Sequence, residues 1–275
     1  VTASTRVTPA GCVAAQCPVR GDLVEPAEVM QVVTIGLFDG IGALRAAVDA
    51  LGWNIIGHIT VEKDDAAARV VESRFPNTIR VHDVTEVSEE MVSSWALKFS
   101  QAALVLIGAG PPCQGVSGLN AARKGALRDA RSNLFVHVSR VRSLVRQSFP
   151  WAQVRTVMES VGSMDKGDQR IMSEDFGDIP WLIDSKGVSL ARRPRLYWVD
   201  WELSGGDGST MESNNQGDRM VLLEASVKQE HFLLPGWQKN SAEPLPTFTT
   251  SRPRDRKSTR LNSSHVNRSR MPSSA

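Results

Sequence analysis

The chain has 275 residues, enough to bury one large core or two smaller ones, and its 41% hydrophobic and 23% charged residues are ordinary for a soluble globular protein. No apolar run approaches the roughly 18 residues that a membrane helix needs, and the first residues lack the basic and apolar regions of a secretory signal. The net charge of +2 is too small to identify a nucleic-acid partner by itself, and three cysteines favour free thiols in a reducing compartment over a disulfide scaffold.

Residues 1–30 mix Thr, Pro, Gly and Ala without periodicity and are predicted to form a loose lead-in. Cys12 and Cys17 lie there, but no second cysteine pair or histidine cluster stands nearby, so no zinc site is predicted. From Val32 the pattern becomes regular. The apolar run "VVTIGLF" ends in "DGIG", which is typical of a buried parallel strand running into a tight turn, and residues 44–51 then repeat apolar side chains along one helical face.

Further strands and helices alternate along the chain as far as Leu203. Strands are predicted over residues 55–62, 78–83, 103–108, 154–160, 181–184 and 195–201, and helices over residues 64–75, 88–99 and 134–145. The alternation predicts an α/β fold with a doubly wound, mostly parallel sheet over residues 31–203. Beyond it, residues 204–218 are predicted to be a flexible link within a small irregular lobe over residues 204–256. The serine- and arginine-rich residues 257–275 are predicted to be a disordered, non-native tail.

Ligands of an open parallel sheet bind beyond the carboxyl ends of its strands, and several candidate groups fall there. Gly40 and Gly42 follow the first strand and would let a ligand approach the backbone closely. Glu62 ends the second strand and could accept both hydroxyls of a ribose, and Asp83 ends the third. This combination indicates an adenosine-containing cofactor. Because "FDGIG" lacks the full G-x-G-x-x-G spacing, glycines that serve only a tight turn remain the alternative.

A cysteine also lies at a strand end, Cys113 in "LIGAGPPCQGVSG". Cysteine reacts as the thiolate, which is favoured in a partly exposed loop near cationic groups. The loop that follows carries one acid, Asp129, and four basic residues: Arg123, Lys124, Arg128 and Arg131. A reactive thiol beside a phosphate-contacting loop is therefore predicted, with an inert cysteine and a solvated loop as the alternatives.

Several motifs together resemble the cytosine-C5 DNA methyltransferases. "GPPCQGVS" is similar to their nucleophile motif, "LFDGIGALRAAVDALG" to the motif that holds S-adenosylmethionine, and "VEKD" and "HDVTEV" to the ribose and adenine contacts. "MESVGSMD" stands at the family's Glu-Asn-Val motif and "ARRPRLYW" at its Gln-x-Arg-x-Arg block. "LNAARKG", "RRPRLYW" and "PTFTTSRPR" are closest to the catalytic domain of the eukaryotic de novo branch. The resemblance runs from about Val32 to Arg254.

The resemblance implies a DNA (cytosine-5)-methyltransferase with the S-adenosylmethionine-dependent methyltransferase fold and a partial target-recognition lobe over residues 204–256. Its implied catalytic residues are Cys113 as nucleophile at cytosine C6, Glu159 at N3, and Arg195 with Arg193 at O2. The implied cofactor-binding residues are Phe38, Asp39, Gly40, Ile41, Gly42, Glu62, Asp83, Val84 and Pro112. The implied nucleic-acid contacts to a flipped-out base and its flanks are Gln114, Ser117, Arg123, Lys124, Arg128 and Arg131.

The implied partner is double-stranded DNA, together with a homo- or hetero-oligomer of related methyltransferase subunits, and no membrane or metal is expected. The implied compartment is the nucleus in a eukaryote and the cytoplasm otherwise. Ser160 replaces the family's asparagine, which is expected to affect geometry and rate rather than reaction class, and Ala191 replaces a glutamine that the de novo branch also lacks. The tail stands where the family completes its cofactor pocket, so the chain is expected to be a fragment that binds S-adenosylmethionine weakly.

Three alternatives stay open from the sequence. The first is a catalytically impaired relative that acts as a DNA-binding or partner module, which Ser160 favours and an intact Cys113 and Glu159 oppose. The second is an RNA cytosine-5 methyltransferase, because a related branch with the same nucleophile motif acts on transfer RNA. The third is a nicotinamide oxidoreductase, which would use the sheet and Glu62 but leave Cys113 without a role.

Overall fold

The structure is a computed structural model that describes residues 30–118, 120–122, 124–189, 191–204, 209–213, 218–223 and 245–246. The strands are β1 (Gln31–Leu37), β2 (Asn54–Val61), β3 (Ile79–Val81), β4 (Leu104–Ala109), β5 (Gln153–Val161), β6 (Trp181–Asp184), β7 (Ala191–Arg192), β8 (Pro194–Val199), β9 (Ser209–Ser213), β10 (Arg219–Leu223) and β11 (Leu245–Pro246). The α-helices are α1 (Ala43–Ala50), α2 (Asp65–Arg74), α3 (Glu89–Lys98), α4 (Val136–Ser148) and α5 (Lys166–Phe176). Short 3-10 helices are η1 (Val84–Glu86), η2 (Ser132–Phe135) and η3 (Ser185–Gly187).

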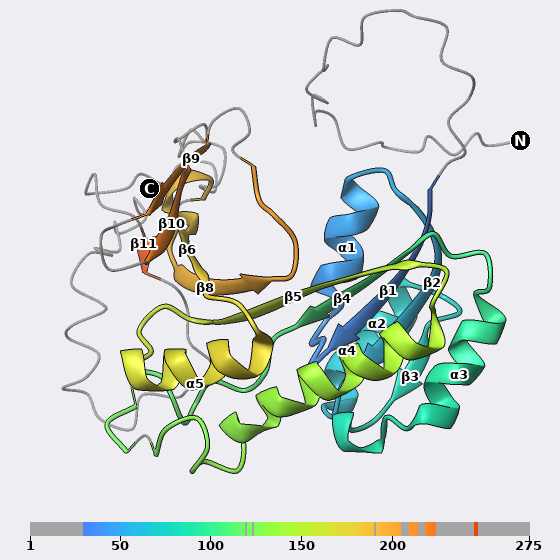
Figure 1. Ribbon diagram of the computed structural model, residues 1–275, viewed down its shortest axis with the longest axis horizontal. Helices are drawn as coiled ribbons and strands as arrows, with labels where there is room; N and C mark the ends of the chain where they lie inside the picture. The colour runs from blue at the N-terminus through green and yellow to red at the C-terminus, as the bar shows by residue number, and fades with distance from the viewer. Residues whose placement is uncertain are drawn as a thin grey trace, which may run out of the picture.

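Nine strands form one sheet in the order β3-β2-β1-β4-β5-β8-β6-β10-β9, while β7 pairs with β11 (Figure 1). All neighbours from β3 to β5 are parallel, β8 runs antiparallel between β5 and β6, and β9 runs antiparallel at the edge. The predicted α/β fold with a doubly wound, mostly parallel sheet is therefore confirmed. The strand order reverses between β1 and β4, and the carboxyl ends of these strands flank the crevice where such sheets bind ligands.

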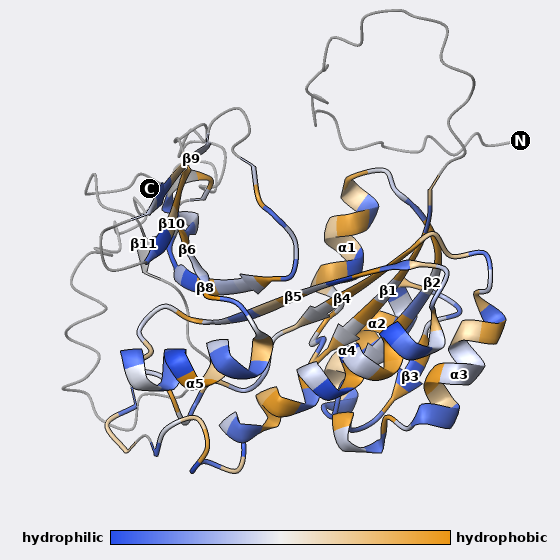
Figure 2. Cartoon of the chain, viewed as in Figure 1, coloured by the Kyte–Doolittle hydropathy of each residue, from blue (hydrophilic) through white to orange (hydrophobic). Residues whose placement is uncertain are grey.

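Helices cover both faces of the sheet, and β4 shows how its side chains divide between them. Successive strand residues point to opposite faces, so Leu104 packs with Val32 and Val48 beneath α1, whereas Val105 belongs to the larger core on the other face. Buried side chains of α3, α4 and α5 complete that core: Val92, Trp95, Val138, Val141, Val145, Met172 and Phe176. Figure 2 shows the hydrophobic central strands and the hydrophilic outer side of α5.

Local sequence explains where several elements begin and end. β1 is buried from its second residue onward, which accounts for its unbroken apolar run. Asp64, Ser88 and Asp165 begin α2, α3 and α5, and each side chain accepts a backbone N–H of the first helical turn. Gly177 ends α5 with a left-handed φ of 91°. In the part of the chain that the structure describes, no helix is long and apolar enough to cross a membrane.

The structure departs from the sequence predictions in two elements. Helix α5 was not predicted, because few of its residues are apolar and the helical period is correspondingly faint. The flexible link predicted over residues 204–218 is wrong for Ser209–Ser213, which form β9 and pair with β10, so the sheet continues beyond Leu203. The predicted lead-in over residues 1–29, the tail over residues 257–275 and most of the small lobe lie outside the described residues.

Candidate active site

The turn after β1 has an unusual backbone that neighbouring groups hold in place. Phe38, Gly40 and Gly42 have φ values of 56°, 57° and 80°, a region that glycine adopts freely and phenylalanine rarely does. The Phe38 N–H donates to the carbonyl oxygen of Val61 at 2.8 Å, and the Gly40 N–H donates to Glu62 Oε2 at 2.8 Å. The turn is therefore fastened to the end of β2.

Both carboxylate oxygens of Glu62 are oriented by backbone amides. Oε2 accepts from Gly40, and Oε1 accepts from the N–H of Asp64 at 2.8 Å. A carboxylate has about four lone-pair sites, so this group can still accept two hydroxyl donors. The geometry suits the ribose contact predicted for Glu62. Ile41 on the turn is 55% exposed and presents an apolar side chain at the rim.

Asp39, predicted as a cofactor contact, directs its side chain into the protein. Its side chain is only 2% exposed, accepts from Thr60 Oγ1 at 2.8 Å, and lies 3.3 Å from His58 Nε2. Only the backbone of Asp39 is thus left at the surface of the turn. In place of the predicted side-chain contact with the cofactor, the Asp39 side chain has a supporting position beneath the turn.

Asp83 begins η1 just beyond β3. Its carboxylate accepts from Lys63 Nζ at 2.8 Å and from the N–H of Thr85 at 3.0 Å. The Lys63 ammonium, followed by the Thr85 amide, holds the pKa of the Asp83 carboxyl well below its usual range, so this group is a permanent anion. The neighbouring Val84 is only 3% exposed.

Arg140 of α4 fastens the backbone beside Asp83. Its Nη2 donates to the carbonyl oxygen of Val84 and its Nη1 to that of Val87, both at 2.6 Å, while Nε donates to His137 Nδ1 at 3.1 Å. The guanidinium therefore joins α4 to η1, the segment where an adenine contact is predicted.

Replacing Arg140 by methionine is expected to lower the free energy of unfolding by about 1–3 kcal/mol, because two half-buried carbonyls lose charged donors. It is also expected to weaken S-adenosylmethionine binding, since η1 is released. Urea unfolding and calorimetry measure the two effects. Arg146→Met is the matched control, because Arg146 lies on the same helix and pairs with Asp200 instead. Equal weakening of cofactor binding by both variants would contradict the assignment.

Cys113 lies just beyond the carboxyl end of β4. Its carbonyl oxygen accepts from the N–H groups of Val116 at 3.1 Å and Ser117 at 2.9 Å, so the chain turns immediately after it. The half-buried side chain packs against the edge of the main core, and Pro112 before it is also half-buried. The thiol is free and stands at the strand end, as predicted.

Glu159 and Arg195 form an ion pair at the ends of two antiparallel strands. Arg195 Nε lies 2.6 Å from Glu159 Oε1, and the two side chains are 19% and 35% exposed respectively. Glu159 stands opposite Tyr197, and Val161 stands opposite Arg195. Because alternate strand residues share a face, the carboxylate, the guanidinium and the phenol project from the same side of the sheet.

The ion pair also lies beside the carboxyl ends of β4 and β1. A Cβ added to Gly110, directly after β4, would lie 3.9 Å from Glu159 Oε2 and 3.9 Å from the carbonyl oxygen of Phe38. This small residue therefore borders both the acid and the cofactor turn. Ser160 is buried and, by strand alternation, points to the face opposite Glu159.

The charges around Cys113 place it in one site with the ion pair. Burial raises the pKa of the Cys113 thiol most, the Glu159 carboxylate raises it further, and Arg195 and Arg193 oppose the rise. Burial and then Glu159 likewise raise the pKa of the Tyr197 phenol. Cys113 and three predicted catalytic partners are thus close enough to interact, and the resting sulfur is held as the thiol.

The raised pKa predicts how alkylation of Cys113 depends on pH. A group whose pKa lies above the ordinary cysteine value of about 8.5 is protonated at neutral pH, and its thiolate fraction rises about tenfold per pH unit below the pKa. The iodoacetamide rate at Cys113 is therefore expected to climb without a plateau from pH 7 to pH 8.5. Peptide mass spectrometry measures this rate separately from those at Cys12 and Cys17. A plateau below pH 8 would contradict the expected direction of the shift.

The loop that follows Cys113 is anchored by side chains from outside it. Three side-chain oxygens accept loop amides: Ser132 Oγ from Gly115 at 2.8 Å, Ser163 Oγ from Gly118 at 3.1 Å, and Asp168 Oδ1 from Ala126 at 2.7 Å. Gly115 has no room for a side chain, since an added Cβ would lie 2.4 Å from the Cβ of Asp129. α5 therefore supports the loop through Asp168.

The predicted nucleic-acid contacts divide by their surroundings. Gln114, Lys124 and Arg128 are exposed, and Ser117 is half-buried beside the nucleophile. The Arg131 guanidinium donates to both carboxylate oxygens of Asp129, and it lowers the pKa of that carboxyl to about 2. Much of the positive charge of Arg131 is therefore neutralised within the loop. Arg123 lies outside the described residues.

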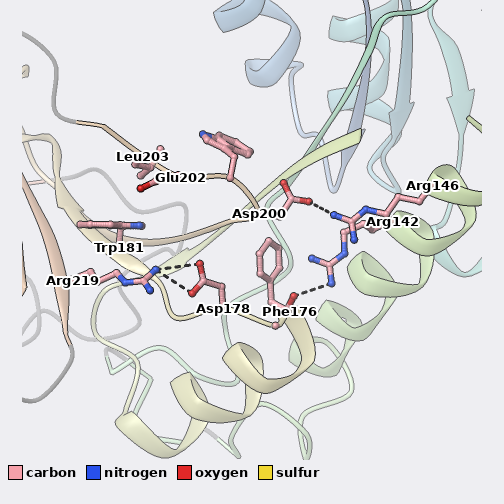
Figure 3. Close-up of a pocket in the computed structure, with 11 residues that line it drawn as sticks. Arg142, Arg146, Phe176, Asp178, Trp181, Asp200, Glu202, Leu203 and Arg219 are labelled. Carbon is pink, nitrogen blue, oxygen red and sulfur yellow. Dashed lines mark hydrogen bonds and ion pairs between the residues drawn. The ribbon is translucent and has the colours of Figure 1, made fainter. Parts of the chain in front are cut away.

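A separate pocket of about 740 Å³ lies between α4, α5 and the start of β10 (Figure 3). Its three arginines already have partners. Arg219 donates to Asp178 at 3.1 Å, Arg146 to Asp200 at 2.7 Å, and Arg142 to the carbonyl oxygen of Phe176 at 2.8 Å. Because these arginines are already hydrogen-bonded within the protein, the pocket is best explained as a place where polar contacts hold α4, α5 and β10 together.

Sequence reasoning missed several residues that build the site. These are His58, Ser132, Arg140, Asp168 and Tyr197, and their partners lie many residues away along the chain. Only two had a local signal. Tyr197 alternates with Arg195 along a strand, and Asp168 stands three residues after the helix-capping Asp165.

The fold and the geometry define an α/β domain whose strand-end cysteine adjoins an acid–arginine pair, next to the glycine-containing turn after β1. Among the described residues, no three His, Cys, Asp or Glu side chains gather in a group that could hold a metal ion. Residues 32–165 match the family of C-5 cytosine-specific DNA methylases, a span that contains both Cys113 and Glu159. This match supports a relationship to the cytosine-C5 methyltransferase family.

Comparison with individual proteins gives matches that are either short or low in sequence identity. The chain is 28% identical over 112 residues to DNA (cytosine-5)-methyltransferase DRM2 of Oryza sativa subsp. japonica, covering 39% of this chain and 18% of the rice protein. A mutant of Spodoptera frugiperda DNMT2 has 16% identity and a TM-score of 0.45, covering 65% of this chain and 53% of that chain. The Entamoeba histolytica methyltransferase EhMeth has 16% identity and a TM-score of 0.46, covering 65% of this chain and 58% of that chain.

Proposed function

We propose that this chain transfers a methyl group from S-adenosylmethionine to C5 of a flipped-out cytosine in double-stranded DNA, through a covalent adduct of Cys113. The observation that carries the proposal is the shared position of Cys113, Glu159 and Arg195 at neighbouring strand ends. The match of residues 32–165 to the C-5 cytosine-specific DNA methylases supports the reaction class. The DNA substrate, the adduct and the residue roles are parts of the proposal.

In this mechanism the Cys113 sulfur would add to C6 of the cytosine, which makes C5 electron-rich enough to attack a methyl group. Loss of the C5 proton to solvent and breakage of the C6–S bond would then release the methylated base and restore Cys113. The thiol must first lose its proton; burial and Glu159 oppose that loss, while Arg195 and Arg193 favour the thiolate. Arg195 would release Glu159 in part and donate to the base O2, while the Glu159 carboxyl would hydrogen-bond N3. Glu159 and Arg195 would thereby stabilise the charge that develops at N3 and O2 of the cytosine ring.

The cofactor would occupy the crevice between the turn after β1 and the ends of β2 and β3. A Cβ on Gly40 would meet nothing within 4 Å, so the turn opens onto free space there, and the Gly40 amide is bonded to Glu62. Glu62 would hold the ribose hydroxyls, and η1 beside Asp83 would hold the adenine. When bound, the sulfonium supplies the methyl group.

A base within a duplex cannot reach Cys113, so the target must leave the stack at a cost of roughly a few kcal/mol. The loop bearing Lys124 and Arg128 would contact the flanking phosphates, since both side chains are exposed. A DNA substrate would place the activity in the nucleus of a eukaryotic cell.

Trapping with 5-fluorocytosine tests the proposal. A duplex containing this base, incubated with the full chain and S-adenosylmethionine, is expected to form a denaturation-resistant complex, because fluorine at C5 blocks release of the enzyme. Proteolysis and mass spectrometry should locate the adduct on the peptide containing Cys113 and on neither Cys12 nor Cys17. An RNA of the same sequence that contains 5-fluorocytosine serves as the parallel substrate for comparison.

Each outcome separates the candidates. An adduct with RNA alone would replace the DNA assignment by RNA cytosine-5 methylation. Binding of the DNA duplex without any adduct would favour a catalytically impaired DNA-binding module. An adduct at a different cysteine would overturn the role of Cys113.

A further inference from the structure

A buried polar cluster lies beneath the cofactor turn and has no part in the mechanism above. It consists of Thr34, Asp39, His58 and Thr60. The side chains of Asp39 and His58 are each 2% exposed, and Thr34 and Thr60 are fully buried. Burying a carboxylate costs several kcal/mol unless it is paired and hydrogen-bonded, so this cluster requires an explanation.

The contacts form a chain that ends at Asp39. Thr34 Oγ1 lies 2.9 Å from His58 Nδ1, and His58 Nε2 lies 3.3 Å from Asp39 Oδ2, close enough for an ion pair but without hydrogen-bond geometry. Thr60 Oγ1 donates to the same Asp39 oxygen at 2.8 Å. Threonines on two paired strands thus flank a histidine–carboxylate pair.

The backbone is shaped to admit the Asp39 side chain. Asp39 folds back over Gly36, where an added Cβ would lie 2.2 Å from the Asp39 Cγ and Oδ1 atoms. The edge of the Phe75 ring closes the cluster from α2, with its centroid 6.0 Å from that of His58. A carboxylate in this enclosure has no route to water unless the turn itself moves.

The turn depends on this support, because Phe38 holds a left-handed φ of 56° that costs of order 1–3 kcal/mol. Asp39 is the next residue, and its inward position fixes the peptide that leads to Gly40. We propose that His58 is a positioning residue which, through Asp39, holds the residue 38–42 turn in the shape that receives S-adenosylmethionine. This inference rests on the proposed function.

A pair of variants separates the two nitrogens of His58. His58→Gln can place an amide nitrogen near the Nε2 position and keep a donor beside Asp39, whereas His58→Asn reaches only the Nδ1 position. We expect His58→Asn to raise the Kd for S-adenosylmethionine and its KM about tenfold with kcat changed less than twofold, and His58→Gln to restore affinity to within about threefold of the parent. Calorimetry and steady-state kinetics on the full chain measure these values.

If His58 served only the stability of the fold, both variants would have a lower thermal midpoint, and KM for S-adenosylmethionine would not rise more than kcat falls. That result would overturn the inference. Hydrogen exchange of the Gly40 amide gives a readout that needs no cofactor, since this amide is bonded to Glu62. It is expected to exchange faster in His58→Asn than in His58→Gln. Equal exchange would also overturn the inference.

Thr60→Val removes the hydroxyl that hydrogen-bonds the Asp39 carboxylate, at nearly constant volume, and serves if His58→Asn does not fold. The same rise in KM is expected, and its absence would count against the inference. A parent chain that binds no S-adenosylmethionine would overturn the proposed function, and the Gly40 exchange rates would still decide whether His58 supports the turn.

Discussion

Cys113→Ser is expected to reduce methyl transfer to duplex DNA by roughly 10³-fold or more, as loss of a covalent nucleophile does in other enzymes. A serine hydroxyl is a far weaker nucleophile than a thiolate at neutral pH, so C6 of the base is not attacked. Transfer of a radiolabelled methyl group measures the effect. No covalent complex with 5-fluorocytosine DNA is expected.

Binding and folding should survive this change. The Cys113 carbonyl, and not its sulfur, accepts the bonds from Val116 and Ser117 that shape the turn. S-Adenosylmethionine affinity and the thermal midpoint are therefore expected to stay close to those of the parent chain. Methyl transfer within tenfold of the parent would refute a covalent role for Cys113.

Glu159→Gln is expected to change two reactions in opposite directions. Methyl transfer should fall about 10²- to 10⁴-fold, because the carboxyl that hydrogen-bonds N3 of the base is lost. Alkylation of Cys113 by iodoacetamide at pH 7.5 should become roughly two- to five-fold faster. The variant removes an anion that raises the thiol pKa and frees Arg195, which lowers it.

Glu159→Gln is informative because it is expected to slow methyl transfer while it speeds alkylation of Cys113. A general loss of structure would slow methyl transfer and expose every cysteine, so alkylation at Cys12 and Cys17 serves as an internal reference. Glu174→Gln is the matched control on α5, where Glu174 is largely exposed and lies 3.9 Å from Arg170. Slower alkylation of Cys113 in Glu159→Gln would contradict the electrostatic coupling between these groups.

Most of the sheet could be predicted because its strands are buried on both faces. The run of residues 32–37 has no polar interruption except Thr34, and such runs separated by amphipathic helices are typical of parallel sheets. Helix α5 escaped prediction since its inward side carries few apolar residues, although Asp165 and Gly177 mark its two ends. Strand β9 escaped because its residues lie at the sheet edge and are mostly polar.

The residues at the strand ends of the candidate site were easier to predict from the topology than the residues that hold them in place. Residues at the ends of parallel strands meet at one edge, so Glu62, Asp83 and Cys113 could be grouped before any coordinates were known, whereas Glu159 was predicted from the family resemblance. Arg140 and Asp168 could not, because each bonds to a backbone group far away in the sequence and neither belongs to a periodic pattern. The inward turn of Asp39 depends on His58 and on the missing side chain of Gly36, a relation that only three-dimensional packing reveals.

The protonated state of resting Cys113 has a chemical consequence for the protein's lifetime. Peroxides oxidise thiolates far more readily than thiols, so an exposed cysteine with a depressed pKa is quickly converted to sulfenic and then sulfinic acid. Burial and the adjoining carboxylate raise the pKa of Cys113 and so keep its sulfur in the less reactive thiol form. In the proposed mechanism, the same electrostatics that make this thiol slow to ionise would also protect it from oxidation.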